Sequence, residues 1–233
     1  MFLPLGNNNS NSIPNPRVIG VHTPEFEFEK KEENVLNAIK QYNINYPVAQ
    51  DNNYATWQTY SNQYWPAEYL IDAKGNMRRT HFGEGEYDQT ELAIQNLLKE
   101  AGLNGDMDLT NMPDQSPKTS LTPETYLGFS RRQGLNSIWT LGGSWDEQDE
   151  YISSKLNSTL DFKFKAAKVF LVITPKLKSD MLEVSLDGKL LKTLTVDQSK
   201  LYTLVDLPTV GSHQLHLNFK TEGTKIFAFT FGD

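Results

Sequence analysis

The sequence predicts an α/β unit followed by an all-β unit, and three observations support this division. Over residues 17–101, short apolar runs alternate with segments whose apolar residues recur at helical spacing. Over residues 124–233, apolar and polar residues alternate in successive short runs, as in strands that bury one face. Residues 102–123 are rich in Gly, Pro, Asp and Ser and show no period, which is typical of a linker.

The first unit is expected to begin with strand, helix, strand and helix. Residues 18–21 (VIGV) form a short apolar run typical of a buried parallel strand. Residues 30–42 are predicted to form a helix with one apolar face. That face consists of Val35, Leu36, Ile39 and Tyr42. The stretches YPVAQD and NYATWQTYS then predict a short strand and a short helix.

A β-hairpin and a final helix are expected to complete the first unit. Residues 67–72 and 77–82 are predicted to be the two strands of the hairpin, joined by the turn DAKGN. Asp88 and Glu91 have the spacing of a capping box, which predicts the start of the helix. The buried face of this helix is expected to consist of Ala93, Ile94, Leu97, Leu98 and Ala101.

The second unit is predicted to be a β-sandwich, because its strands follow one another at short spacing with one apolar face each. Asp187 and Gly188 are expected to turn a hairpin between LEVSL and KLLKTLTV, and VFLVIT is expected to be a central strand. The alternating apolar sets are Leu160, Phe162 and Phe164, then Leu215, Leu217 and Phe219, then Phe227, Phe229 and Phe231.

Composition excludes several classes of function. The net charge of −7 argues against a nucleic-acid partner, since phosphate binding relies on a basic patch. No apolar run approaches the ~18 residues that a membrane-spanning helix needs. The chain has no cysteine, which excludes disulfides, thiolate metal sites and cysteine nucleophiles within it. The Asn- and Ser-rich residues 1–16 are expected to be a flexible arm.

Three stretches of the first unit resemble a known family. VIGVHTPEFEFE, the segment from YPVAQD through YWPAEYLID to GEGEY, and the closing amphipathic helix resemble the thioredoxin-like (TlpA/redoxin-type) domain of DipZ-type proteins. These are membrane-anchored thiol–disulfide oxidoreductases of the cytochrome-c-biogenesis class. The second unit, with TPETYLGFSR and FAFTFG, resembles the β-domain that follows in that family, which is similar to carbohydrate-binding modules.

The resemblance runs from about Arg17 to the end of the chain and implies a domain plan. It implies a thioredoxin-like domain over residues 17–101, a linker over 102–123 and a jelly-roll-like sandwich over 124–233. It also implies an extracytoplasmic location, periplasmic or at the cell envelope, for the intact protein. No targeting signal is recognised in this sequence, since the N-terminus has no basic lead-in and only a brief apolar start.

The segment Tyr64, Trp65 and Pro66 stands directly before a predicted strand. Proline cannot donate a ladder hydrogen bond, and a bond between an aromatic residue and proline tolerates the cis isomer. The resemblance implies that this is the cis-proline loop that holds an incoming peptide beside the redox cysteines. Taken without the resemblance, the same residues fit a rigid structural turn equally well.

The sequence departs from the family where the chemistry resides. The family pattern requires a strand and a Cys-x-x-Cys helix upstream of VIGV, and only about sixteen arm-like residues stand there. We therefore expect a truncated thioredoxin-like domain without redox activity. The absent strand would lie between VIGV and AEYLID, so the sheet is expected to be interrupted there. Either MFLPL or another chain fills that place, or the N-terminal half is partly ordered.

Other candidate sites are few. His22 and Glu25 follow a strand end and, by the resemblance, would lie near the absent redox site; a loop with solvated polar groups is the alternative. Trp139 and Tyr151 are candidates for stacking on a glycan, whereas Trp145 is expected to belong to the core. No cofactor motif is recognised, and His213 and His216 are spaced to face opposite sides of a strand, which makes a poor metal pair.

Two functions from different classes remain at this level. One is a thiol–disulfide oxidoreductase of the DipZ type that is redox-inactive in this chain, with a cysteine-containing protein as its partner. The other is a non-catalytic module that binds a glycan or a protein and carries a thioredoxin-like remnant. The oligomeric state does not follow from the sequence.

Overall fold

The computed structural model describes residues 17–103, 108–113, 120–132 and 138–233. The chain divides into two compact units, Met1–Ser116 and Pro117–Asp233, and the boundary lies inside the stretch 102–123. Each unit is described by itself. The predicted arm over residues 1–16, with its MFLPL segment, lies outside the described residues.

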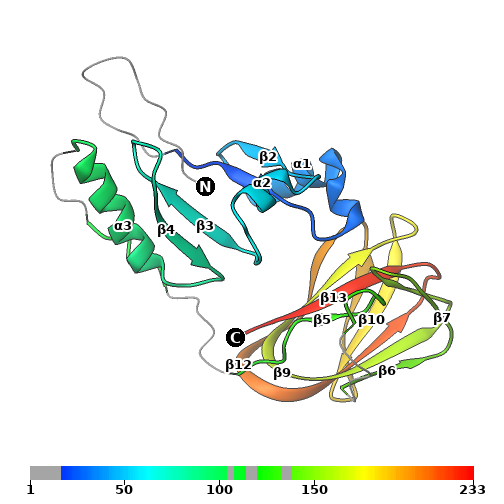
Figure 1. Cartoon of the computed structure of the whole chain (residues 1–233). Coiled ribbons are helices and arrows are strands. Elements are labelled where there is room, and N and C mark those ends of the chain that lie inside the picture. The colour runs from blue at the N-terminus through cyan, green and yellow to red at the C-terminus, as the bar shows by residue number, and fades with distance from the viewer. Residues whose placement is uncertain (1–16, 104–107, 114–119, 133–137) are drawn as a thin grey trace. The chain divides into compact units, whose positions relative to one another are not determined.

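The first unit contains strands and helices in the predicted order, with one additional short helix (Figure 1). In chain order its elements are β1 (Gly20–His22), the 3-10 helix η1 (Glu27–Lys30), α1 (Glu32–Gln41), β2 (Val48–Gln50), α2 (Ala55–Thr59), β3 (Ala67–Ile71), β4 (Met77–Phe82) and α3 (Tyr87–Glu100). Only η1 was not predicted, because it lacks an apolar period of its own.

The strands of this unit form two separate sheets. β1 pairs in parallel with β2, and β3 pairs in antiparallel with β4. The hairpin turns at Asp72, whose carboxylate accepts the backbone N–H groups of Lys74 and Asn76 at 2.9 and 2.8 Å. Across the described part of the chain no ladder joins β1 to β3, so the sheet is interrupted where the sequence predicts the interruption.

The helices cover these sheets less completely than predicted. In α1 only Val35 is buried, whereas Leu36 and Tyr42 are 46% and 62% exposed, so two members of the predicted apolar face lie in solvent. In α3 the predicted apolar residues are half-buried and Gln95 is the buried one. A complete apolar face requires a complete sheet to cover, and two narrow sheets leave part of each helix exposed.

The predicted capping box of α3 is wrong. The N-cap residue is Glu86, which has a left-handed backbone with φ of 52° and makes no side-chain cap. Asp88 therefore lies inside the first turn. The carboxylate of Glu91 instead accepts the backbone N–H and the hydroxyl of Thr110, at 3.0 and 2.7 Å. The tight turn at Gly85-Glu86, both with positive φ, starts the helix without a side-chain acceptor.

The second unit is a single curled antiparallel sheet of nine strands (Figure 1). Its strands are β5 (Thr125–Tyr126), β6 (Trp139–Gly142), β7 (Trp145–Glu147), β8 (Ile152–Ser154), β9 (Ser158–Thr174), β10 (Asp180–Leu186), β11 (Lys189–Val196), β12 (Lys200–Phe219) and β13 (Lys225–Gly232). They run in the order β11-β10-β12-β9-β13-β8-β7, while β5 pairs with β13 and β6 with β9. The unit is therefore all-β, as predicted.

Two long strands, β9 and β12, give the sheet its curl. They pair along most of their 17 and 20 residues, and the ladder shifts register between Asp206 and Gly211. Such irregularities bend a strand and increase its twist, so one sheet can face itself. The predicted central strand VFLVIT thus forms the last six residues of β9 and is not a separate element. The hairpin at Asp187 and Gly188 is confirmed, with φ of 50° and 78°.

The apolar core of the second unit lies inside this curl. Phe162, Phe219 and Phe229 are its largest fully buried side chains, and the rings of Phe162 and Phe229 lie 4.7 Å apart. The alternating apolar residues predicted in β9, β12 and β13 supply most of this core. Burial of these large rings stabilises the unit by the transfer of apolar surface from water.

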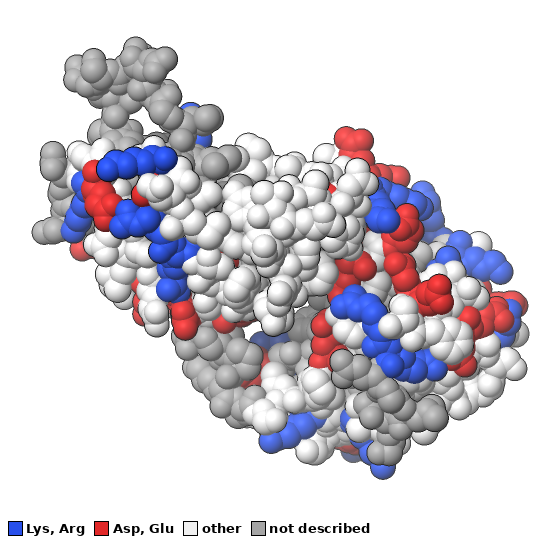
Figure 2. Space-filling view, viewed as in Figure 1, with Lys and Arg blue, Asp and Glu red and all other residues white. Residues whose placement is uncertain are grey.

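Charged side chains of both signs are mixed on the face of the molecule that Figure 2 shows. Figure 2 shows Lys and Arg interspersed with Asp and Glu on the viewed face of the chain, with no broad region of one sign. Within the described ranges, no helix is both long enough and apolar enough to cross a membrane.

Candidate functional site

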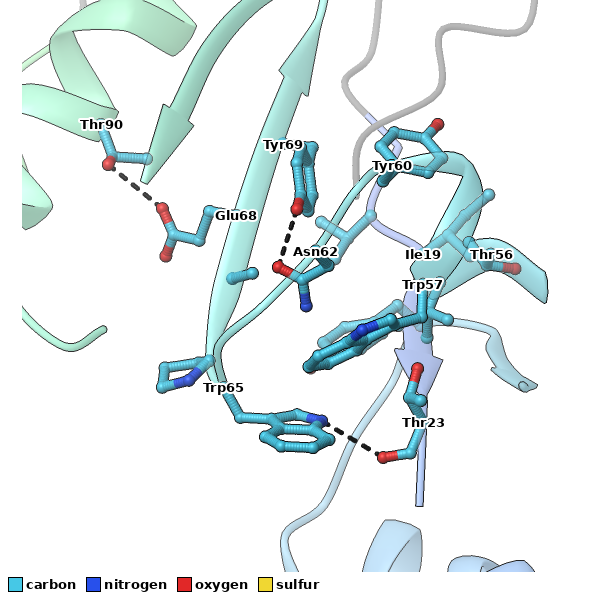
Figure 3. Close-up of a pocket in the computed structure, with 16 residues that line it drawn as sticks. Ile19, Thr23, Thr56, Trp57, Tyr60, Asn62, Trp65, Glu68, Tyr69 and Thr90 are labelled. Carbon is cyan, nitrogen blue, oxygen red and sulfur yellow. Dashed lines mark hydrogen bonds between the residues drawn. The ribbon is translucent and has the colours of Figure 1, made fainter. Parts of the chain in front are cut away.

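A cleft of about 640 Å³ opens in the first unit between β1 and β3 (Figure 3). One wall is the strand edge from Val18 to Val21, and the opposite wall runs from Trp65 to Tyr69. Two aromatic residues complete the lining together with polar side chains. They are Trp57, which lies in α2, and Tyr60, which directly follows α2. The cleft therefore lies where the sheet of this unit is interrupted.

The backbone of β1 presents one edge to the cleft. Gly20 donates its N–H to the Pro47 carbonyl at 2.9 Å, and the His22 carbonyl accepts the Asp51 N–H at 2.8 Å. Both residues thus face the β2 side. Because backbone groups of successive residues point to opposite sides of a strand, those of Ile19 and Val21 point away from β2. Ile19 and Val21 both line the cleft.

The backbone of β3 presents an edge in the same way. Gly83 donates its N–H to the Pro66 carbonyl at 2.9 Å. This bond shows which residues of β3 direct their backbone N–H and C=O groups toward β4, because that direction alternates along the strand. The backbone groups of Glu68 then face β4, and those of Ala67 and Tyr69 face away from it. In the described part of the chain, neither β1 nor β3 pairs with a further strand on these edges.

Aromatic rings form the floor of the cleft. The rings of Trp57 and Trp65 lie 4.3 Å apart, and those of Tyr60 and Tyr69 lie 4.9 Å apart. The Trp65 indole N–H is donated to the Thr23 carbonyl at 3.2 Å, which ties the loop before β3 to the end of β1 (Figure 3). Trp65 is nevertheless 45% exposed, so its ring remains open to a ligand.

Two pairs of polar side chains in the cleft are hydrogen-bonded to each other. The Tyr69 hydroxyl is donated to the Asn62 side-chain oxygen at 2.8 Å, and the Thr90 hydroxyl to Glu68 at 3.2 Å (Figure 3). Glu68 is the one charged residue among the described residues that line the cleft. The remaining lining is mainly apolar, which favours an apolar occupant.

Asp51 holds the helix that carries Trp57. Its carboxylate accepts the backbone N–H groups of Thr56 and Trp57 at 3.0 and 2.8 Å and the Thr23 hydroxyl at 3.2 Å. Burial acts to raise the pKa of Asp51, but these hydrogen bonds outweigh it and lower the pKa below 3.8. The sequence analysis missed this residue, although an aspartate between a strand and a helix is the usual signal for a cap.

The predicted residues His22 and Glu25 do not line the cleft. A ring nitrogen of His22 lies 3.1 Å from the Glu29 carbonyl oxygen, and Glu25 donates its backbone N–H to the Glu29 carboxylate at 2.7 Å. Burial raises the pKa of Glu29, and the Glu25 N–H partly offsets this. Both predicted residues thus contact Glu29, a half-buried residue that the sequence analysis did not identify.

The predicted loop residues Tyr64, Trp65 and Pro66 play different parts. Trp65 and Pro66 line the cleft, and the peptide bond between them is cis. Tyr64 does not line it; its ring is 56% exposed and packs edge-on against Phe82 at 5.5 Å. The loop is therefore open to solvent at Tyr64 and forms one wall of the cleft at Trp65.

The aromatic residues singled out in the second unit are partly buried. The Arg132 guanidinium lies 5.3 Å from the Trp139 ring, and the Lys225 ammonium lies 4.4 Å from the Tyr151 ring. Trp145 packs edge-on against Phe219 at 5.1 Å beside the core, as predicted. Trp139 and Tyr151 thus each have a cation close to one ring face.

The histidines of the second unit pair with different carboxylates. His213 lies 2.8 Å from Asp187, and His216 lies 2.9 Å from Asp161. No group of three His, Cys, Asp or Glu side chains converges as a metal site among the residues with a described position.

Comparison with known proteins gives one family match, which lies within the second unit. Residues 135–232 match the family described as the thioredoxin-like C-terminal domain. Over 133 residues, 56% of this chain, the sequence is 47% identical to protein DipZ of Mycobacterium bovis, and the match spans 19% of the DipZ chain. The same figures hold for DipZ of Mycobacterium tuberculosis. These matches confirm the resemblance to DipZ-type proteins.

Two further matches are more distant. NHL repeat-containing protein 2 of Homo sapiens is 31% identical over 110 residues, 47% of this chain and 15% of its own. Among solved structures, a family two carbohydrate esterase from Cellvibrio japonicus matches with a TM-score of 0.41 and 12% identity, over 47% of this chain and 33% of its own. This chain spans less than a fifth of the length of DipZ.

Proposed function

We propose that this relative of DipZ-type proteins holds an extended, cysteine-bearing polypeptide on its first unit and supplies none of the reacting thiols. The first unit would be a thioredoxin-like domain, and Tyr64, Trp65 and Pro66 would form its peptide-holding loop. His22 and Glu25 would lie beside the place of the thiol chemistry, and the protein would act outside the cytoplasm. The second unit would be a jelly-roll-like accessory domain.

The observation that supports this proposal is the anchored loop at the open strand edges. The indole of Trp65 is fixed to the Thr23 carbonyl at 3.2 Å while 45% of the residue stays exposed. An exposed aromatic ring on a fixed loop, beside strand edges that pair with no further strand among the described residues, suits an extended peptide, whose backbone pairs and whose side chains pack. The 47% identity to DipZ, together with the thiol–disulfide chemistry that the family resemblance implies, supports a cysteine-bearing peptide as the partner.

The absence of cysteine limits what the chain does alone. Thiol–disulfide exchange begins with attack by a thiolate, and the 233 residues contain sulfur only in methionine. These 233 residues therefore supply neither the attacking thiolate nor the resolving thiol. With dithiothreitol as reductant, we expect the chain to leave the rate of insulin reduction at the level of buffer. A rate above buffer would overturn the proposal.

Peptide holding is tested by fluorescence anisotropy with a labelled extended peptide that carries one alkylated cysteine. We expect binding that weakens about tenfold in Trp65→Ala, because a buried aromatic contact contributes 1 kcal/mol or more. Phe129→Ala is the matched control, since Phe129 is a 57% exposed aromatic of the second unit. Equal affinity for the wild type and Trp65→Ala would show that the loop does not hold the peptide.

The alternative is a non-catalytic unit that binds a glycan through Trp139 and Tyr151. Sugar stacking needs an open ring face, and here the cations of Arg132 and Lys225 lie within 5.3 and 4.4 Å of those rings. The geometry therefore supports this alternative less well. Loss of oligosaccharide retention in Trp139→Ala during affinity electrophoresis would favour it.

A further inference from the structure

We infer that three adjacent turns at one end of the second unit form a membrane-contact surface, which inserts two leucines into a bilayer of anionic lipid. The tip turns, as we name them, connect β8 to β9 (residues 155–157), β9 to β10 (175–179) and β12 to β13 (220–224). The inference goes beyond the proposed function, because it concerns the second unit and involves neither the cleft nor a peptide.

Backbone hydrogen bonds and one close contact hold the tip turns side by side. Gly223 donates its N–H to the Ser154 carbonyl at 2.7 Å, and Asn157 donates its N–H to the Phe219 carbonyl at 2.9 Å. Both bonds join the first turn to the third. The side chain of Lys176, in the second turn, lies against Gly223, since a Cβ at Gly223 would fall 2.4 Å from the Lys176 Cδ. The three turns therefore present their side chains together.

Two leucines are exposed in these turns. Leu156 in the first turn is 64% exposed, and Leu177 in the second is 57% exposed. Turn geometry favours Gly, Asn, Asp, Ser and Pro, so neither turn requires a leucine. Neither leucine belongs to the apolar core of the unit. The fold therefore does not account for these two side chains, and each gains free energy when it leaves water.

A buried carboxylate fixes the second turn. Asp180 is 0% exposed, and its carboxylate accepts the backbone N–H groups of Lys176 and Leu177 at 2.8 and 3.0 Å. It also accepts the Thr224 hydroxyl at 2.7 Å, which ties the second turn to the third. Leu177 is thus exposed on an ordered backbone. Because that backbone is already fixed, its insertion costs less conformational entropy than insertion of a flexible loop.

The charge of the tip turns favours an anionic partner. They contain four lysines and one glutamate, although the chain as a whole has a net charge of −7. Lys155 pairs with Asp146 and Lys220 pairs with Glu183. Lys176 and Lys178, on either side of Leu177, are exposed and form no ion pair within the part of the chain that the structure describes. Lysines that flank an inserted apolar side chain bind the phosphate groups of an anionic leaflet.

Two leucines on separate turns suit a lipid phase better than a protein. A protein partner would need two apolar pockets at matching positions, both surrounded by acidic residues. The acyl region of a bilayer accepts an apolar side chain at any position, and its headgroups supply the negative charge. An acidic protein surface is the competing partner, and the test distinguishes the two.

The test locates the inserted residues with a fluorophore. Because the chain has no cysteine, one introduced cysteine is labelled uniquely with the environment-sensitive dye NBD. We expect Leu156→Cys and Leu177→Cys, labelled in this way, to give brighter and blue-shifted emission with vesicles of equal parts phosphatidylglycerol and phosphatidylcholine. Leu190→Cys is the matched control, because Leu190 is 63% exposed but pairs with Ser185, at the far end of β10 from Asp180. It should give no shift.

Sedimentation of the full chain with the same vesicles measures the affinity. We expect the double variant Leu156→Ser, Leu177→Ser to bind about tenfold or more weakly, since two apolar side chains no longer leave water. Lys178→Gln should bind about fivefold more weakly at low salt. Vesicles of phosphatidylcholine alone should bind the wild type at least about tenfold more weakly. The substituted side chains are exposed, and circular dichroism verifies that each variant is folded.

Several results would overturn the inference. No sedimentation of the wild type with anionic vesicles would do so directly. Equal binding of the double leucine variant would show a purely electrostatic surface, which suits an acidic protein. An equal emission shift at Leu190→Cys would show adsorption without a defined contact surface. The vesicles contain neither a peptide nor a thiol, so the result is independent of insulin reduction and of peptide anisotropy, and failure of the proposed function is separately visible.

Discussion

The two units of this chain differ in how completely their strands are paired. The second unit joins nine strands into one curled sheet, whereas the first divides its strands between two sheets of two strands each. Burial follows the same division. All twelve of the largest fully buried side chains lie in the second unit, and the first has four buried apolar side chains among its described residues: Phe26, Val35, Tyr69 and Leu70.

This difference shows that strand pairing and burial depend on each other. A wide sheet offers a continuous face against which side chains pack, and a two-stranded sheet is marginal in water. The first unit therefore keeps an open cleft and exposed helix residues such as Leu36 and Tyr42. Among the described residues, the same incompleteness leaves β1 and β3 without a further paired strand at the cleft.

The largest expected effect concerns folding in isolation. We expect the second unit to fold by itself and the first unit not to form a stable fold alone. We expect residues 120–233, expressed alone, to unfold cooperatively in a calorimeter, because this unit contains a complete apolar core. Residues 1–101 alone should show a broad transition without a clear heat-capacity peak. A sharp transition of 1–101 together with an unfolded 120–233 would reverse the assignment.

The next largest effect is expected from a substitution that creates a cavity in the core of the second unit. Phe162→Ala removes a ring that is 1% exposed and contacts Phe229 at 4.7 Å. We expect it to lower the free energy of unfolding of the second unit by about 3–5 kcal/mol, measured by urea denaturation. Leu190→Ala, at a 63% exposed site in β11, is the control and should change it by less than about 0.5 kcal/mol. Similar costs for both variants would contradict the assignment of the core.

In the first unit, Asp51 is expected to be the most sensitive polar residue. Asp51→Ala removes the acceptor for the N–H groups of Thr56 and Trp57, and loss of such a cap costs about 1–2 kcal/mol. We expect amide hydrogen exchange at Thr56 and Trp57 to accelerate about tenfold or more. Asp51→Asn keeps an acceptor oxygen and should give a smaller change. Unchanged exchange in Asp51→Ala would show that α2 is held by its aromatic packing alone.

The same residue gives a pH dependence. The pKa of Asp51 in the folded chain is below 3.8, so its stabilising contribution is fully present above that value. As pH falls below 3.8 and through the folded-state pKa, the contribution is lost, because the unfolded chain binds the proton more tightly. Protection at Trp57 should fall in this range in the wild type and be less pH-dependent in Asp51→Asn. A fall of equal size in both would assign the titration to another group.

Much of the fold is predictable from the sequence because local signals agree with the tertiary structure. The hairpin at Asp187 and Gly188 combines a turn that needs positive φ with alternating strands on both sides, and both signals lead to the same structure. The order of elements in the first unit follows equally from apolar periodicity. The merging of two predicted strands into β9 does not, because a strand that bends and continues carries no turn residue to count.

The candidate site is less predictable from the sequence, because it depends on contacts between separate elements beside an interrupted sheet. Trp65 and Pro66 were identified from the sequence, but the ring contact between Trp57 and Trp65 at 4.3 Å joins residues on separate elements. Glu29 and Asp51 were missed, since their roles come from backbone N–H groups that only the folded chain brings together. The exposure of Leu36 was missed because helical periodicity predicts a face and not what covers it.

The smallest expected effect is a difference in stability between two variants, each of which replaces one tryptophan in one of the two units. Trp65→Phe removes the indole N–H that bonds to Thr23 at 3.2 Å, and Trp145→Phe removes the one that bonds to Gly142 at 3.1 Å. Each loses a neutral hydrogen bond of about 0.5–1.5 kcal/mol. Trp145→Phe should cost more, because its ring also packs against the buried Phe219 at 5.1 Å, whereas Trp65 is 45% exposed.

Urea denaturation of each variant, followed by the fluorescence of the remaining tryptophans, measures this difference. We expect Trp65→Phe to stay within about 1 kcal/mol of the wild type, since water can replace the lost donor at an open cleft. A ring contact with Trp57 is expected to remain in this variant, so the loop should keep its position beside β1. Complete unfolding of the first unit by Trp65→Phe would instead show that this single bond bridges the two small sheets. The cleft would then depend on the loop more than on the strand edges.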